Sequence, residues 1–474
     1  MGATDFSELR MARQRPLDTS GSALGDEATI ARQTGETVTV AESNGTITIT
    51  GLANADYDAQ QVVRISGGTS VAGLNDDFVV KADRTTGPLT LETPAGKEGI
   101  AGGDTIDIGS LLVMQETGEG FGAEFESSES EIKVPVRGTQ DLVRQAARAR
   151  GSISSELSFP NFTHVMDAAF QNPWERSGDG QSNVVATNVT TTVSAAARTL
   201  AGTGIEANIN PRDCVRIEGG ANDGAVVIVT AIAPNLLTVT GDVLVDSNSA
   251  ISLRKADRMV PGSSIRPYTV ERRYSDGQIL EVGAPRCIGM APDTFSFSGG
   301  RSGQITVESG WLGAREVSPT PTSLIGVSAG RSVGDVLTVS SNAQLWISGV
   351  STGCTTGFTL NYANNLFEQN CWGSGLEATE ITTRTLSVSG SFSRFYSSKT
   401  AYDRFLADND ETLVVTLKDP ESGKVRVFDL PRVKYADAGR AAGARNNDIE
   451  FSANFSALIS EDVDATVVMW GFDS

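Results

Sequence analysis

The chain has 474 residues, with 38 Lys and Arg against 58 Asp and Glu, which gives a formal net charge of -20. This balance argues against a general nucleic-acid-binding protein, because such proteins hold phosphates on a basic surface. Hydrophobic residues make up 39% of the chain, too many for a disordered protein, and the length suggests about three domains.

The N-terminal segment 1–18 lacks the apolar stretch of a secretory signal, and no apolar run approaches the roughly 18 residues that cross a bilayer. We therefore expect that the chain does not insert into a membrane and that it is made in a reducing cytoplasm. The cysteines lie far apart without the close spacing of a zinc site, so we expect free thiols. They are Cys214, Cys287, Cys354 and Cys371.

Short alternating stretches rich in β-branched residues dominate the chain, among them 46–50, 304–308 and 424–428. This pattern predicts mostly antiparallel β-structure. A small β module occurs twice, near 37–111 and 183–258. Each copy has the same three elements in the same order, namely a Val-Arg-Ile strand with a Gly-rich turn, an Asn-Asp turn before a second strand, and a Leu-Thr strand. We interpret these modules as small barrels with tight hairpins.

A larger pattern also occurs twice and begins with a strand and an amphipathic helix. The first strand starts at Gly151 and the second starts at Gly390. Apolar residues at helical spacing follow each strand and predict one buried helix face. These residues are Phe162, Val165, Met166, Ala169 and Phe170 in the first copy, and Ala401, Tyr402, Phe405 and Leu406 in the second.

Each copy continues with a hairpin, over 269–284 and 413–430, that ends in Pro-Arg and leads to another strand. The residue numbers of corresponding positions in the two copies differ by 144 to 146. The chain therefore reads as two copies of one unit, joined near 319–322, with the first copy interrupted by insertions. The predicted inward residues of the last strands are Ile305, Val307, Ser309 and Trp311, and Ile449, Phe451, Ala453 and Phe455.

Motifs for chemistry are weak. Two G-x-S-x-G matches, at 326–330 and 349–353, are not followed by the helix that a nucleophile elbow needs. The single histidine, His164, lies within the first predicted helix, where a solvated or interface position is expected. We therefore expect no catalytic activity, no cofactor and no metal site.

A charge contrast marks the segment 124–150. Its first part is acidic and its last part is basic, which suggests either a solvated hairpin or a contact with another subunit through complementary charge. The residues of the contact hypothesis are Glu126, Glu129, Glu131, Arg144, Arg148 and Arg150.

The segments Arg148–Phe159 and Val165–Phe170, and the later alternating run Arg384–Phe392, resemble tail tube proteins of long-tailed, siphovirus-like phages. The resemblance covers roughly 112–182 and 259–474. It implies a mainly β fold with two tandem β-sandwich units, each with a flanking helix, whose sheets form a β-barrel ring on assembly. The first unit would comprise 1–36, 112–182 and 259–320, and the second 321–474, with 37–111 and 183–258 as inserted modules.

The resemblance also implies a structural virion protein that polymerises into stacked rings, assembled in the host cytoplasm, through which DNA is ejected. Simple members of such a family form rings of six subunits. Since each chain here carries two units, three chains would close a ring. Expected partners are other copies of the chain, the tape measure, terminator and distal tail proteins, and double-stranded DNA in transit. The arginines Arg144, Arg148 and Arg150 would contact the next ring.

DNA must pass without being held, so the residues that line the channel should be acidic or neutral rather than basic. The candidates are the strand residues that alternate with the inward set. They are Thr306, Glu308, Glu450 and Ser452. Alternative interpretations are a distal tail or baseplate hub ring of the same fold and, less favoured, a secreted adhesin or surface-layer protein. The inserted modules 37–111 and 183–258 are expected to project outward and to be dispensable for tube closure.

Overall fold

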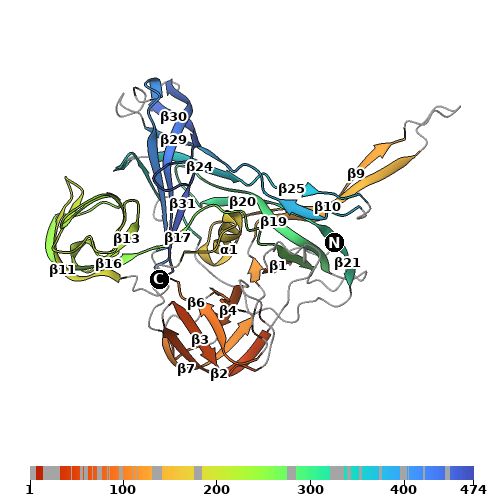
Figure 1. Cartoon of the computed structure of the whole chain (residues 1–474). Helices are drawn as coiled ribbons and strands as arrows, with labels where there is room; N and C mark the ends of the chain where they lie inside the picture. Colours follow the sequence, from red (N-terminus) through yellow and green to blue (C-terminus); the bar gives the residue numbers. More distant parts are fainter. Residues whose placement is uncertain are drawn as a thin grey trace.

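The computed structural model describes 7–13, 32–43, 45–53, 57, 62–66, 68–71, 77–82, 84, 86–94, 100–109, 112–114, 116–130, 141–175, 184–274, 284–320, 336–338, 343–351, 355–372, 376–395, 403, 405–419, 422–442 and 449–473. Within these residues the chain is almost entirely antiparallel β-structure, with one α-helix (Figure 1).

The strands outside the small modules fall into two series. The first contains β1 (Ser7–Arg13), β8 (Leu112–Met114), β9 (Gly118–Glu129), β10 (Leu142–Glu156), α1 (Phe159–Phe170), β17 (Asp257–Met259), β18 (Tyr268–Tyr274), β19 (Ala284–Gly299), β20 (Thr306–Gly313) and β21 (Arg315–Thr320). The second contains β22 (Ala343–Ile347), β23 (Val350–Ser351), β24 (Thr355–Ala363), the hairpin β25 (Phe367–Gln369) and β26 (Glu380–Thr382), β27 (Ser387–Phe395), β28 (Glu411–Lys418), β29 (Val425–Ala442), β30 (Ile449–Ala457) and β31 (Val468–Phe472).

Both series pair their strands in the same way. In the first, β1 pairs with β8 and β18, β18 with β19, β19 with β20 and β21, β20 with β10, and β10 with β9. In the second, β22 pairs with β23 and β28, β28 with β29, β29 with β30 and β31, β30 with β27, and β27 with β24. One β-sandwich topology therefore occurs twice.

Each series forms two layers because its longest strand changes layers. The first half of β19 pairs with β18 and β21, and its second half, from Ala291 onward, pairs with β20, with a register shift between Pro292 and Thr294. In β29 the same change occurs around a shift between Tyr435 and Asp437. A bulge bends a strand and increases its twist, so one strand can serve both layers.

The two series share one continuous sheet. Its order is β9-β10-β20-β19-β24-β27-β30-β29, and the pair β19–β24 joins the series edge to edge. We call these eight strands the main sheet. In Figure 1 the hairpin of β29 and β30 projects at the top and the arm formed by β9 and β10 projects at the upper right.

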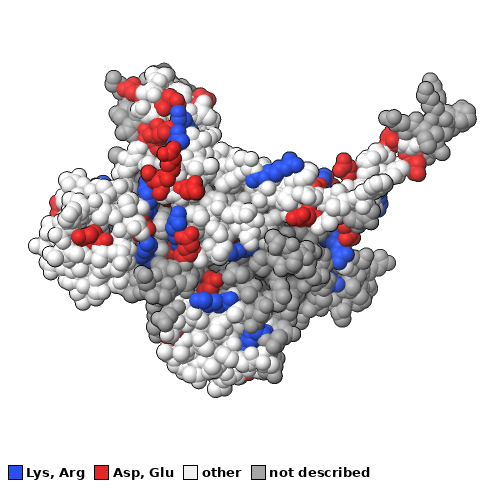
Figure 2. Space-filling view, viewed as in Figure 1, with Lys and Arg blue, Asp and Glu red and all other residues white. Residues whose placement is uncertain are grey.

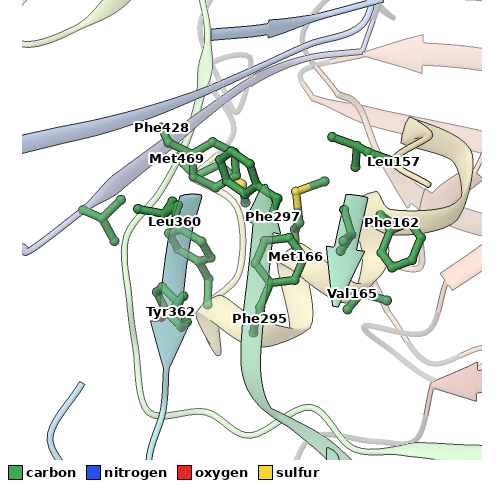
Figure 3. Packing of buried hydrophobic residues seen from close by; sticks show 14 of the residues in the cluster. Leu157, Phe162, Val165, Met166, Phe295, Phe297, Leu360, Tyr362, Phe428 and Met469 are labelled. Atoms are coloured by element: carbon green, nitrogen blue, oxygen red, sulfur yellow. The ribbon is translucent and has the colours of Figure 1, made fainter. Parts of the chain in front are cut away.

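The main sheet buries one face against the second layer and α1. All five helix residues that were expected to be buried lie in the core, including Phe162, Val165 and Met166. Figure 3 shows part of the cluster that they form with the strands. The ring centroids of Phe170 and Tyr362 are 5.0 Å apart, which ties the helix to β24. The helix starts with a proline in its first turn and ends at Gln171, which has a left-handed backbone conformation.

The glycines Gly151 and Gly390 occupy corresponding positions in β10 and β27. A Cβ atom at Gly151 would lie 2.0 Å from the Phe121 ring, and one at Gly390 would lie 2.6 Å from the Phe455 ring. An aromatic ring therefore lies directly on the backbone at both sites, which is why each strand of this type contains a glycine there.

The small modules have a common strand order. The second is a closed barrel of β11 (Val184–Ser194), β12 (Thr199–Ala201), β13 (Cys214–Glu218), β14 (Val226–Ala233), β15 (Leu236–Gly241) and β16 (Ser247–Lys255), with a short 3-10 helix at Gly220–Asn222. The first is a sheet of β2 (Arg32–Ser43), β3 (Thr46–Thr50), β4 (Val62–Ser66), β5 (Asp77–Val79), β6 (Leu89–Glu92) and β7 (Ala101–Gly109). Its order, β5-β4-β7-β2-β3-β6, matches the barrel, and the bridge Val80–Leu91 joins its ends.

Several expectations from the sequence were wrong in detail. Leu406 is 66% exposed, so it does not pack on a helix face, and Ala401 and Tyr402 lie outside the described residues. Ile449 is 49% exposed because it starts β30 at the end of the projecting hairpin. Pro431 lies inside β29, which continues to Ala442, and Pro319 belongs to β21 rather than to a linker.

Candidate functional site

The exposed face of the main sheet carries small polar residues in rows that cross the strands. One row contains Ser154, Glu308, Ser296, Asn361, Ser389 and Ser456, and the next contains Thr306, Ser298, Thr359, Ser391 and Asn454. A third row contains Gly357, Ser393, Ser452 and Gly439, and none of these residues is buried. We call this surface the polar face.

Short hydroxyl contacts keep this surface flat. The hydroxyl oxygens of Ser298 and Thr306 are 2.9 Å apart, and the hydroxyl of Thr356 donates to that of Ser393 at 2.9 Å. Where these small side chains bond to one another, no long group reaches out from the sheet. The polar face can therefore line a space without filling it.

Charge on the polar face is sparse over β19, β20, β24, β27 and β30. There and on β29 the charged residues are Glu156 of β10, Glu308, Glu450, Asp437 and Lys434. On β9 and β10 the same face also carries Glu124, Arg148 and Arg150, and both arginines pair with Glu124. The Nζ atom of Lys434 donates to Asp408 at 2.6 Å, and this contact raises the pKa of the lysine. In the view of Figure 2, basic and acidic side chains also lie side by side in small groups rather than in extended basic patches.

All four residues expected to line a channel lie on this face. Thr306 and Glu308 are exposed on β20, and Ser452 is exposed and Glu450 half-buried on β30. Their neighbours Ile305, Val307 and Phe451 are buried in the sandwich. The period of two within a strand produces this separation, because successive side chains point to opposite faces.

The far side of the second sandwich is covered by the barrel module. Residues that alternate with the core of β28, β29 and β31 form a second buried cluster with Cys214, Val226 and Ile228 of the module; they are Val414, Val425, Val427, Val468, Trp470 and Phe472. This layer is therefore buried on both faces, and its strands are almost continuously hydrophobic. The module and the polar face consequently lie on opposite sides of the sandwich.

Two ion pairs accompany this contact. Arg212 of the module binds Asp429 of β29, and Lys418 of β28 binds Asp242 of the module. Asp429 is fully buried, and burial raises its pKa to about 6 although Arg212 acts in the opposite direction. Sequence reasoning missed these pairs because their partners are 217 and 176 residues apart in the chain.

The two ends of the main sheet are edges. Past Lys434 the described part of β29 pairs only with β30, and β9 pairs as a strand only with β10. Side chains contact the backbone of β9 at its outer edge: Arg272 donates to the carbonyl oxygen of Phe121 at 3.2 Å, and the amide of Ala123 donates to Glu316 at 2.6 Å. Arg272 also pairs with Glu119. Such contacts cover the polar groups of an otherwise unpaired strand.

The residues of the subunit-contact hypothesis lie on or near the arm of β9 and β10, and most of its arginines are paired within the chain. Arg148 binds Glu124 and Glu368, Arg150 binds Glu124 at 3.0 Å, and Arg144 lies 4.1 Å from the centre of the Phe125 ring. Glu126 and Glu129 are exposed, and Glu131 lies outside the described residues.

Residues considered for chemistry do not come together. His164 is 7% exposed inside α1, so it is a buried residue rather than a solvated one. In the second G-x-S-x-G match, Gly349 lies in the turn after β22 and the next two residues form β23. The rest of that match, the whole first match and Cys354 lie outside the described residues. Cys214 and Cys287 are buried free thiols, and the described residues contain no group of three or more potential metal ligands.

Comparison with known proteins decides the family. The family model of phage tail tube proteins matches residues 75–457, which is most of the chain. The chain belongs to this family. A search of curated proteins finds no match.

Membership of the tail tube family agrees with the duplicated β-sandwich, and it makes the chain a structural component of a phage tail. The match starts inside the first small module and includes the whole barrel module, so these insertions lie within the matched region. No helix among the described residues is long and apolar enough to cross a membrane.

Proposed function

We propose that three copies of this tail tube protein close into a ring, with the main sheets joined into one β-barrel and the polar face lining the channel. The observation that carries this proposal is the pair β19–β24, which joins two copies of one sandwich edge to edge within a single chain. The resemblance implies rings of six such sandwiches, and each chain supplies two.

The size of such a barrel supports a conduit for DNA. Three main sheets of eight strands give 24 strands; at about 4.8 Å between strands and a tilt of about 35–45°, the backbone radius is about 22–26 Å. Barrels of 16–18 strands already enclose an aqueous channel. Six chains would give a ring roughly twice as wide.

The chemistry of the polar face supports passage without retention. Lys or Arg in the channel would attract phosphates and release their counterions, which would favour binding over movement. The neutral rows with their few glutamates avoid that attraction over most of the wall, and Arg148 and Arg150 near the junction are paired with Glu124. Because the barrel module covers the side of the sandwich opposite the polar face, we propose that it lies on the outer surface of such a ring.

Stacking of rings is the second part of the proposal. The arm of β9 and β10 extends beyond the sandwich and exposes Phe125, Leu142 and Val143. Because Arg148 and Arg150 are paired within the chain, we assign the contact with the next ring chiefly to these apolar residues together with Arg144, Glu126 and Glu129. The tape measure, terminator and distal tail proteins are proposed partners of the finished tube.

Electron microscopy of the purified protein tests this function. We expect tubes whose cross-section has threefold symmetry with a sixfold appearance, and an acidic or neutral channel wall. Single rings that never stack would favour a distal tail or hub component instead. Rings of six chains, or a channel lined by the module side of the sandwich, would contradict the proposal.

A further inference from the structure

We infer that the ring closes by pairing β29 of one chain with β9 of a second copy in one defined register, in which Gly439 lies opposite Gly122. The inference rests on the proposed ring and specifies its junction at the level of single residues. The partner of each open edge is therefore the opposite edge of the main sheet in a neighbouring chain.

The first step is the correspondence between the two sandwiches. Tyr268 pairs with Met290 in the first, and Glu411 pairs with Val433 in the second, so both partners are shifted by the same offset in the numbering. The register shifts after Tyr268 and Glu411, and those after Pro292 and Tyr435, are separated by this same offset. Because the register shifts occur at corresponding residues, they determine which residue of β29 corresponds to each residue of β19.

The second step aligns β9 with β24. Gly151 pairs with Phe121, and its counterpart Gly390 pairs with Leu360. The offset in the numbering from Gly151 to Gly390 equals the offset from Phe121 to Leu360. The alignment holds along the strands, because Ala149 pairs with Ala123 and Val388 pairs with Tyr362 at the same offset.

The third step transfers the internal junction to the outer edges. Within the chain Phe295 lies opposite Tyr362, Ser296 opposite Asn361, and Phe297 opposite Leu360. The corresponding residues between chains are Ala438 with Ala123, Gly439 with Gly122, and Arg440 with Phe121. Gly122 and Gly439 both lie at positions that face the polar side of the sheet. The row containing Ser452 therefore continues into the next chain.

The open edge of β9 carries an independent sign of this pairing. In the transferred register, the carbonyl oxygen of Phe121 and the amide of Ala123 are backbone groups that the incoming strand must bind. These are the two groups that Arg272 and Glu316 contact in the single chain. The two side chains thus stand in for the neighbouring strand until assembly, and they protect the edge from other partners.

The charges at the junction are compensated. Asp437 would lie beside Glu124, and two like charges directly opposite are unfavourable. Glu124 is held by both Arg148 and Arg150, and these contacts lower its pKa. The two arginines therefore offset the added carboxylate.

Cysteine cross-linking tests the register. Gly122 and Gly439 form a pair whose backbone groups do not bond across the junction, with an expected Cα separation of about 4.5 Å, which suits a disulfide. A Cβ atom at Gly122 meets nothing within 4 Å, and one at Gly439 meets only the Ser452 hydroxyl at 4.0 Å. We would combine G122C and G439C in a chain with C354S and C371S, assemble it, and oxidise the paired thiols with diamide.

The matched control is G120C with G439C. Gly120 is on the same strand and face, and a Cβ there meets only the Ser152 hydroxyl at 3.8 Å. The diagonal distance of about 7–8 Å is too long for a disulfide. We expect reducible dimers and trimers from the first pair, with trimers as the limit, and at least tenfold less product from the control.

The outcomes separate the two proposals. Equal or better cross-linking through Gly120 would overturn the register. Threefold rings without cross-links from either pair would overturn the β29–β9 junction while leaving the proposed function intact, and a chain that never assembles would overturn both. Hydrogen exchange on unmodified protein gives a second measurement: the Ala123 and Arg440 amides should exchange at least tenfold more slowly in tubes than in single chains.

Discussion

At the scale of single residues, the pair Arg212–Asp429 controls how the barrel module is held. Asp429 is fully buried, and its pKa is raised to about 6 mainly by burial. A carboxyl whose pKa is higher in the folded state binds protons more tightly there, so its contribution to stability is largest at low pH. That contribution is lost as the pH rises through about 6. Arg212 limits the loss by favouring the charged form.

Replacing Arg212 by Met should therefore destabilise the chain, and more so at pH 8 than at pH 5. Removing one partner of a buried ion pair commonly costs about 3–5 kcal/mol, because the other charge stays buried. At pH 5 Asp429 can take up a proton and escape most of this cost. Thermal melting at the two pH values measures the difference.

The control for this prediction is Arg258→Met. Arg258 binds Glu175 at 2.9 Å, but the carboxylate side chain is 55% exposed, so the pair should contribute less than about 1 kcal/mol. A melting temperature that falls equally at pH 5 and pH 8 in the Arg212→Met variant would show that Asp429 is not the group involved.

At the scale of elements, the sequence predicted which segments form strands and helices better than where they end. The apolar period of α1 and the alternation in β20 were sufficient, because burial on one face determines both patterns. The Pro-Arg pairs suggested too large a difference in residue number between the two hairpins. Tyr268 pairs with Met290 and Glu411 pairs with Val433, and this pairing gives a smaller difference. The two prolines lie within long strands and do not mark equivalent ends.

The two modules are predicted to differ when deleted. The apolar cluster of the first module contains only its own residues, and Arg32 lies opposite Gly109, so a short linker can replace 32–109. The barrel module shares a buried cluster with β28, β29 and β31. The expectation that 183–258 is dispensable is therefore replaced by a prediction of instability.

Replacing 184–255 by a short linker should expose Trp346, Val414 and Trp470 and leave Asp429 without Arg212. Each large apolar side chain loses about 1.5–3 kcal/mol of burial energy. We expect this variant to aggregate or to melt at least about 10 °C lower, while the variant without 32–109 still forms tubes. Calorimetry and microscopy of both variants provide the measurement. Equal tolerance of both deletions would contradict the role assigned to the shared cluster.

At the scale of the whole molecule, the polar face was partly predictable and its edges were not. Alternation alone separated Thr306 and Glu308 from Ile305 and Val307, because a strand with one buried face has only two sets of positions. The order of strands in the main sheet depends on pairing between residues far apart in sequence, such as Phe297 with Leu360. No local pattern specifies that neighbour, so the junction required the structure.

The proposed channel predicts a specific effect of added charge. Thr306→Lys with Ser452→Lys places two cations per chain on the polar face, and six in a ring of three chains. Both residues are exposed, so assembly should be unaffected. DNA passing the ring would meet these cations in every ring of the tube, and each phosphate contact adds about 0.9 to the salt slope of binding. We expect at least tenfold slower ejection from phage that carry this variant, with recovery at high salt.

The matched control is Thr39→Lys with Thr105→Lys on exposed positions of the first module, which adds the same charge away from the polar face. Ejection at the normal rate from the first variant, or equal slowing in both, would contradict the assignment of the polar face to the channel.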